Sequence, residues 1–353
     1  MIDELSLKPD LDDALVRWQA FWAGEIIDRP CVAVRVPKGG DFPWPSYRDR
    51  CGDVRAAVEK AAASVENFEY LGEAVPYVSA DLGPDQYGAW LGGHIQFSGD
   101  SGNTNWIEPF VDDWRSAMPL RVRWDGEAWQ KTVALMEALA DAGAGRFLVG
   151  MLDLHSNFDA LSAMRSPCRL SMDIYDEPGV VREAARQVGD TFVPVFERLE
   201  TAGKHNERGY IGWIGAYSPT RYAVTQCDYA CMLSREMFVE FVLPELRKEW
   251  SFLDHTIYHY DGVTALQHLP AVLAEPDVDA IQWVPGAGNR ENYLWDDLML
   301  EIQRAGKGLH VAAPPEQVRR LHGVLRPERV FYDTWCDSVA EAESLLDWLR
   351  RNT

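Results

Sequence analysis

The stretch GLHVAAPPEQVRRLHGVLRPERVFYDTW, residues 308–335, contains a complete strand–helix–strand pattern. The apolar runs 308–313 and 329–335 lack strict alternation, which is typical of strands buried on both faces of a parallel sheet. Between them, a helical pattern begins at Pro314 and Pro315. Proline suits the first turn of a helix because its missing N–H has no partner there. We therefore expect a unit in which a helix connects two parallel strands, the building block of α/β folds.

The same alternation of apolar runs and helical patterns continues back to the N-terminus. Eight strands with helices between them predict a (β/α)8 TIM barrel, because the count and the length of 353 residues fit that fold. An open doubly wound sheet is the alternative. We expect one domain, 1–353, with an N-terminal helical extension and an insertion near residues 83–125. The expected strands are Pro30–Val36, Val75–Ala80, Arg146–Asp153, Gly209–Gly215, Thr256–Asp261, Val278–Val284, Gly308–Ala313 and Arg329–Trp335.

Composition narrows the class of protein. The formal net charge of −21 disfavours nucleic acid as a partner, because an acidic surface repels phosphate groups. No apolar run approaches the roughly 18 residues of a membrane span, and the acidic start MIDELSLKPDLDD does not resemble a signal peptide. The six cysteines are scattered, which is typical of reduced thiols rather than a disulfide framework. We expect a cytoplasmic protein that does not bind membranes.

The fifth expected strand ends in TIYHYDG, residues 256–262. His259 and Asp261 are two positions apart, so their side chains point to the same face of the strand. Cys336 follows the eighth strand, and in a barrel the carboxyl ends of all strands meet at one rim. An imidazole, a carboxylate and a thiolate make a three-ligand zinc site with an open position. The alternative is a hydrogen-bonded strand end and a buried thiol.

Other polar and aromatic side chains near the strand ends are candidate substrate contacts. They come from DLHSNF (153–158), from GNTNW (102–106) in the insertion, and from the end of the sixth strand. Plain loop positions are the alternative for GNTNW. The candidates are Asp153, His155, Asn103, Trp106, Gln282 and Trp283.

The stretch QCDYACMLSREMFVEFVLPELRKEWSFLDHTIYHYDG (226–262) resembles the uroporphyrinogen decarboxylase-like superfamily. Members have an aspartate, a helix of the pattern LS…F.EF.LP, and a strand that ends in an H-x-C-G type motif. The segments EIIDRPCVAVRVP (25–37) and HSNFDALSAMRSPCRLSMDIYDEPGVVREA (155–184) also resemble the family. The resemblance implies a TIM barrel and places Asp228 in the catalytic site together with His259 and Asp261.

The branch that this chain resembles is the zinc-dependent methyltransferases, whose ligands are H-x-C and a second cysteine after the last strand. Asp261 replaces the first of these cysteines, and Cys336 follows 336 − 261 = 75 positions later. The resemblance implies a Zn²⁺ ion on His259, Asp261 and Cys336 that activates a thiol for methylation. The implied methyl donor is a methyl-corrinoid on a separate partner protein.

Two rival functions remain open. On the same barrel, a metal-free decarboxylase-like lyase would use Asp228, His259 and Asp261 as acid and base toward a small carboxylated substrate. A binding protein without catalysis is the other rival, because Asp261 stands where the family has a cysteine.

Overall fold

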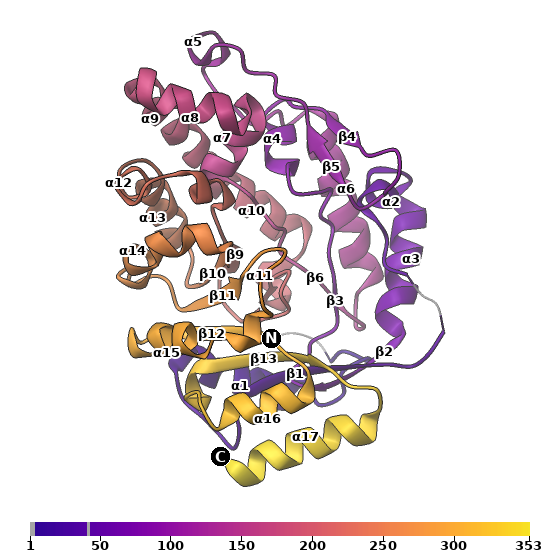
Figure 1. Ribbon diagram of the computed structural model, residues 1–353. Coiled ribbons are helices and arrows are strands. Elements are labelled where there is room, and N and C mark those ends of the chain that lie inside the picture. The colour runs from indigo at the N-terminus through magenta and orange to yellow at the C-terminus, as the bar shows by residue number, and fades with distance from the viewer. Residues whose placement is uncertain (1–3, 41–42) are drawn as a thin grey trace.

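The central feature of the computed structural model, which describes residues 4–40 and 43–353, is a seven-stranded sheet (Figure 1). Its strand order is β2-β1-β13-β12-β11-β10-β9. All neighbouring pairs are parallel except β1 and β2, which are antiparallel. The bounds are β1 Cys31–Pro37, β2 Phe68–Gly72, β9 Tyr222–Thr225, β10 His255–Asp261, β11 Ala280–Val284, β12 Gly308–Ala312 and β13 Val330–Trp335.

Shorter strands form three further pairs. β3 (Tyr77–Val78) lies parallel to β6 (Leu148–Val149). β4 (Ile95–Phe97) with β5 (Asn105–Ile107), and β7 (Tyr210–Ile211) with β8 (Tyr217–Ser218), are antiparallel. In addition, a parallel bridge joins Met151 to Gly212, just after β6 and β7.

Helices connect the strands. The α-helices are α1 Leu11–Ala23, α2 Tyr47–Cys51, α3 Val54–Glu66, α4 Gln86–Trp90, α5 Trp114–Ala117, α6 Glu127–Ala142, α7 Asn157–Arg165, α8 Pro167–Asp176, α9 Pro178–Gly189, α10 Phe192–Ala202, α11 His205–Arg208, α12 Arg235–Met237, α13 Leu243–Phe252, α14 Leu269–Leu273, α15 Asp296–Arg304, α16 Pro315–His322 and α17 Val339–Asn352. Short 3-10 helices include η1 (Asp228–Met232), and a π-helical turn, Phe238–Val242, joins α12 to α13.

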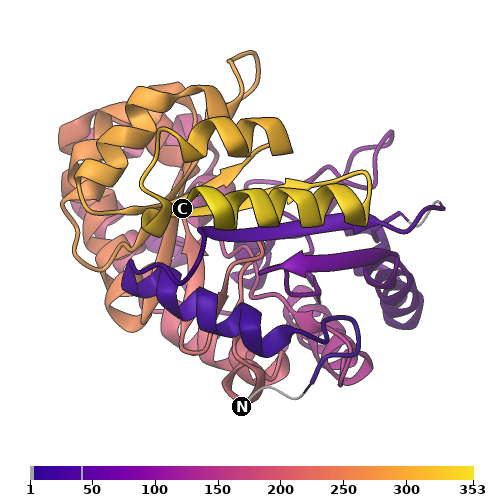
Figure 2. The same ribbon diagram turned by 90° about the horizontal axis from the view of Figure 1, so that it is seen from below.

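Local sequence signals explain where several helices begin. Ser234 accepts a hydrogen bond from the backbone N–H of Met237, so its hydroxyl caps α12 as its position predicts. Ser338 caps α17 in the same way. Leu345 and Leu349 on α17 are fully buried, so they form the apolar face by which this helix packs on the core. Figures 1 and 2 show α17 packed along β1 on the outside of the sheet.

Strand register identifies the inner face of the sheet, since paired residues of neighbouring strands point to the same side. His259 pairs with Gln282, Gln282 with His310, and His310 with Phe331. The Phe331 ring packs against Trp18 of α1, with ring centroids 4.6 Å apart, and both side chains are buried. Helix α1 therefore covers the inner face near the amino ends of the strands, and polar residues occupy that face nearer the carboxyl ends.

These observations confirm the α/β class. All eight expected strands contain a strand of the structure, although β3, β6 and β7 are only two residues long. Within residues 4–40 and 43–353, no hydrogen-bonded ladder joins β2 to β3 or β8 to β9. Closure of the barrel therefore stays a prediction.

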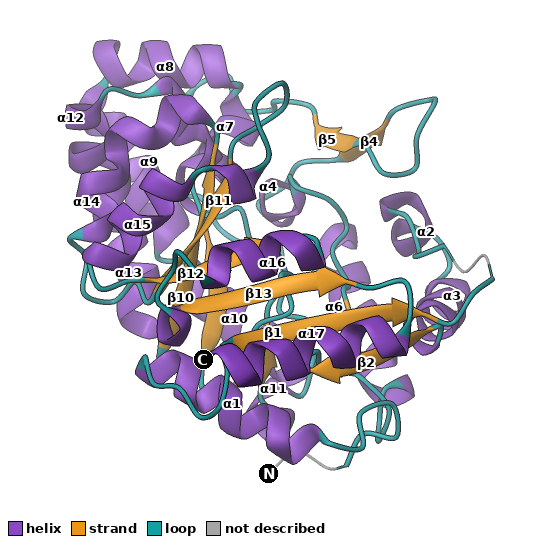
Figure 3. Cartoon of the chain, turned by 60° about the horizontal axis from the view of Figure 1, so that its bottom comes forward, coloured by secondary structure: helices purple, strands orange, loops and turns teal. Residues whose placement is uncertain are grey.

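The expected insertion, residues 83–125, contains α4, the β4–β5 hairpin and α5. Figure 3 shows this hairpin standing apart from the large sheet. In the part of the chain that the structure describes, no helix combines the length and apolar character needed to cross a bilayer.

Candidate metal centre

Three ionisable side chains converge at the carboxyl ends of β9 and β10. Asp228 begins η1, three residues after β9, while His259 and Asp261 are on β10. One potential ligand atom from each residue lies within 4.8 Å of the other two. Among the described residues, this is the one group of three or more His, Cys, Asp and Glu side chains that meets this criterion. The alternation along β10 explains why His259 and Asp261 share a face.

The hydrogen bonding of His259 prepares it for a metal. Its Nδ1 lies 2.6 Å from Oε1 of Gln282, which is an acceptor, so Nδ1 carries the proton and Nε2 has a free lone pair. Burial lowers the pKa of His259, which favours the neutral ring that a metal needs. The edge of Trp213 packs against this imidazole, with ring centroids 5.3 Å apart. Gln282 and Trp213 thus fix the orientation of the ring.

The two carboxylates also fit a cation. Oδ1 of Asp261 is buried and has no hydrogen-bond partner. Burial, followed by the nearby charge of Asp159, raises the pKa of Asp228 to about 7. A buried acceptor without a donor is rare in native proteins, and a bound cation would satisfy it. These features make Asp228, His259 and Asp261 a chemically suitable divalent-cation site.

A second ring of charged groups surrounds Asp228. Asp159 accepts hydrogen bonds from the backbone N–H groups of Asp228 (3.0 Å) and Tyr229 (2.8 Å), and so holds the start of η1 in place. His155 lies 3.0 Å from a carboxylate oxygen of Asp153, 3.6 Å from Asp159 and 4.0 Å from Asp228. Burial lowers the pKa of His155, but the carboxylates of Asp153 and Asp159 outweigh it and raise the pKa well above the usual value. His155 therefore supplies a positive charge among the acids.

The buried carboxyl group of Glu249 holds the segment that follows His155 in place. Glu249 of α13 is buried, and its Oε1 accepts hydrogen bonds from the Ser156 hydroxyl (2.6 Å) and the Asn157 amide (3.2 Å). The amide of Asn157 also donates to the carbonyl of Gln226, at 3.1 Å. Burial raises the pKa of Glu249 to about 8. The network ties α13 to the loop that carries His155.

Further polar side chains lie on the inner face of the sheet, on strands away from the candidate metal centre. On β1, Arg35 donates to both carboxylate oxygens of Asp333 on β13, at 2.5 and 2.7 Å. Burial by itself would raise the pKa of Asp333, but the Arg35 guanidinium outweighs this and keeps the pKa below its ordinary value. His310 is buried beside this pair, and neither of its ring nitrogens has a hydrogen-bond partner. Polar groups thus extend from β10 across to β1.

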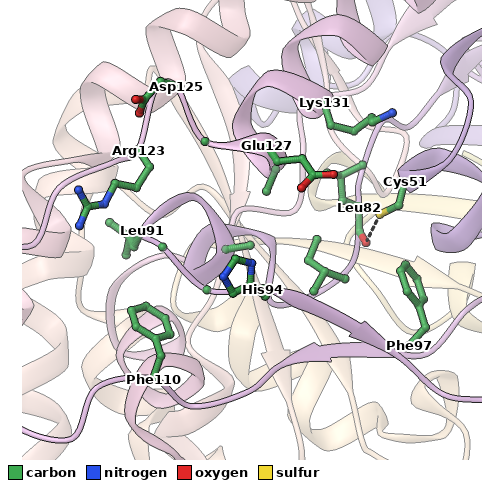
Figure 4. A pocket seen from close by; sticks show the side chains of 16 residues that line it. Cys51, Leu82, Leu91, His94, Phe97, Phe110, Arg123, Asp125, Glu127 and Lys131 are labelled. Atoms are coloured by element: carbon green, nitrogen blue, oxygen red, sulfur yellow. Dashed lines mark hydrogen bonds between the residues drawn. The ribbon is translucent and has the colours of Figure 1, made fainter.

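Two cavities are relevant to ligand binding. One, of about 480 Å³, is lined by His155, Asp159 and Asp228, so it shares Asp228 with the candidate metal centre, while His259 and Asp261 do not line it. A larger cavity, of about 720 Å³, lies between the insertion and the start of α6 (Figure 4). His94, Phe110, Arg123 and Lys131 line this larger cavity, but the metal-centre residues do not.

The structure groups His259 and Asp261 with Asp228 and not with Cys336, the third ligand that the sequence led us to expect. Cys336 lies one position past Trp335, and Trp335 pairs with the inward-facing Arg35. Alternation along the chain therefore turns the sulfur toward the outer helices. Burial and then the charge of Glu341 on α17 raise the pKa of Cys336 to about 11. Asp228, expected as a catalytic residue, is the side chain that lies with His259 and Asp261 instead.

The structure also places the expected substrate contacts. His155 and Trp106 line the 480 Å³ cavity. Asp153 does not line this cavity, but its carboxylate lies 3.0 Å from the ring of His155, which does. Gln282 also lies outside the cavity and contacts His259 instead. Trp283 pairs with Tyr260 on the outer face of the sheet and is buried, so this expected contact is placed away from the site. Asn103 is exposed in the turn between β4 and β5 and lines neither cavity, which also differs from the expectation.

Sequence reasoning missed Asp159, Gln226 and Glu249. Asp159 is one helical turn after His155, and this i,i+4 spacing is the signal that could have paired them. Gln226, whose amide lies 2.6 Å from the His155 ring, directly precedes the CDYAC segment. A single buried glutamate on an otherwise ordinary helix, as Glu249 is, gives no signal in the sequence.

Comparison with known proteins supports the architecture. The chain is similar to the structure of a methyltransferase from Methanosarcina mazei, with a TM-score of 0.63 and 12% sequence identity over 99% of each chain. No protein-family model matches the chain, and no sequence among the curated proteins does. At this low identity, the similarity shows a shared fold.

Proposed function

We propose that the protein is a metal-dependent methyltransferase in which Asp228, His259 and Asp261 hold a divalent cation, expected to be Zn²⁺. The observation that carries this proposal is the convergence of the three ligand atoms within 4.8 Å at the carboxyl ends of neighbouring strands. The fold shared with a methyltransferase over 99% of both chains supports it. The resemblance of residues 226–262 to zinc-dependent methyltransferases points in the same direction.

The metal would activate the group that receives the methyl. Zn²⁺, when bound, lowers the pKa of a coordinated thiol and so supplies a nucleophile at neutral pH. One imidazole and two carboxylates leave one position of a four-coordinate ion open for that nucleophile. The two carboxylates also make this ligand set harder than one with thiolates.

The surrounding residues position the ligands. Gln282 holds His259 with Nε2 free, and Asp159 fixes the backbone from which Asp228 extends. His155 places a positive charge 4.0 Å from Asp228, which offsets the repulsion among the carboxylates. The neutral Glu249 keeps the His155 loop attached to α13 without adding another negative charge.

A methyl-transfer assay tests the proposal. The purified chain is stripped with a chelator, reloaded with Zn²⁺, and mixed with methylcobalamin, a soluble methyl-corrinoid, and 2-mercaptoethanol. We expect zinc-dependent formation of the methyl thioether, which His259→Ala abolishes and Cys336→Ser retains. A rate equal to that of the protein-free mixture, with or without zinc, would contradict the proposal. Whether the physiological donor is a corrinoid on a partner protein remains a prediction.

A further inference from the structure

The 480 Å³ cavity beside the metal centre has the volume of a small-molecule site. Asp228 belongs to both the cavity wall and the metal centre. A ligand in the cavity would therefore contact Asp228, one of the three proposed metal ligands. The residues that line the cavity therefore indicate which class of molecule could be the second reactant in the proposed methyl transfer.

The charged residues of the walls are mainly acidic. Asp85, Asp159 and Asp228 line the cavity together with the positively charged His155. Among the described residues that line it there is no lysine or arginine. Oδ2 of Asp85 accepts a hydrogen bond from the backbone of Ile107, and this bond holds the carboxylate against β5. With Asp228 bound to the metal and Asp159 3.6 Å from the positive His155, Asp85 is the lining carboxylate whose charge is left to attract a cation.

The remaining walls are aromatic and apolar. Trp106 of β5 is 42% exposed, although tryptophan is large and apolar, and it lines the cavity. Tyr229 also lines the cavity but is only 5% exposed, because its ring stacks on Phe158 and its hydroxyl forms a 2.8 Å hydrogen bond with Ser171. Met232, 49% exposed, completes the η1 side. Aromatic faces combined with carboxylates recognise quaternary ammonium groups, because the ring faces attract a cation that cannot donate hydrogen bonds.

We propose that this cavity binds a small quaternary ammonium ion, which serves as a methyl donor alternative to the methyl-corrinoid that the resemblance implies. The inference rests on the proposed function and names the donor by chemical class. In the transfer, the bond between nitrogen and one methyl carbon breaks, and its electron pair stays on nitrogen to give a neutral tertiary amine. A thiolate supplies the electron pair of the new sulfur–carbon bond, and its proton has already been released to solvent. The cation and the thiolate thus become two neutral products.

Choline and its neutral carbon isostere, 3,3-dimethylbutan-1-ol, test the recognition step by calorimetry on the full chain. We expect choline to bind at least about tenfold more tightly, because the isostere lacks the charge that the aromatic faces and carboxylates attract. Trp106→Ala should weaken choline binding by about five- to thirtyfold. Trp44→Ala, which removes a similarly exposed tryptophan outside the cavity, is the matched control and should leave it unchanged.

Equal affinity for choline and the isostere, or no binding of choline at millimolar concentration, would overturn the proposal. Neither result touches zinc binding or the transfer of methyl groups from methylcobalamin, so the two proposals fail separately. The donor role is tested by NMR detection of dimethylaminoethanol and the methyl thioether after incubation with choline, Zn²⁺ and 2-mercaptoethanol. Choline binding without these products would overturn the donor role.

Discussion

Replacing Glu249 with glutamine should stabilise the protein at neutral pH. The carboxyl has a pKa of about 8 in the folded chain, raised from 4.5 chiefly by burial. Between these two pH values the folded state keeps a proton that the unfolded state has lost, so stability falls as pH rises through the window. From pH 4.5 to 7 the loss amounts to about 3 kcal/mol. Glutamine cannot ionise, and its carbonyl oxygen can still accept from Ser156 and Asn157.

Urea unfolding followed by tryptophan fluorescence, at several pH values from 4.5 to 8, measures this effect. We expect wild type and Glu249→Gln to have similar stability near pH 4.5 and to diverge steadily above it. The variant should be about 3 kcal/mol more stable at pH 7. A pH-independent difference between the two, or a variant that is less stable at pH 7, would refute the idea that Glu249 is buried as a neutral acid.

Three further predictions concern stability and metal affinity. Burial lowers the pKa of His205 from 6.5 to about 4, so the free energy of unfolding should fall by up to about 3 kcal/mol as the pH drops from 6.5 to 4. Thermal melts should show this loss in wild type and not in His205→Gln. Asp333→Asn leaves Arg35 without its carboxylate and should lower the free energy of unfolding in urea by about 3 kcal/mol. Gln282→Ala frees the His259 ring, and competition with a chelator should show zinc affinity reduced about 10- to 100-fold while the circular dichroism spectrum is unchanged.

The sequence predicted best what depends on local pattern. The apolar runs of β1, β10, β12 and β13 are long enough that their type and approximate bounds follow from periodicity. In contrast, β9 is only Tyr222–Thr225 and was missed, because four residues carry too little periodicity to separate a strand from a loop. Its place beside β10 depends on pairing between segments distant in the chain.

The candidate metal centre shows the same division between local pattern and distant contacts. His259 and Asp261 lie on one strand, so their shared face follows from local alternation. The directions of the Cys336 and Asp228 side chains depend instead on where the chain leaves β13 and β9. One residue past Trp335 is enough to turn a side chain to the other face of the sheet. Asp228 reaches the centre because Asp159, distant in the chain, binds its backbone, and a single sequence gives no signal for that contact.

The most direct test of the account is the metal content of four purified proteins after exposure to Zn²⁺ and gel filtration. Wild type and Cys336→Ser should each retain one zinc per chain by elemental analysis, while Asp228→Asn and His259→Ala should retain almost none. The opposite pattern, with zinc lost from Cys336→Ser and kept by Asp228→Asn, would show that the ion is held elsewhere and would contradict the assignment of Asp228, His259 and Asp261 as its ligands.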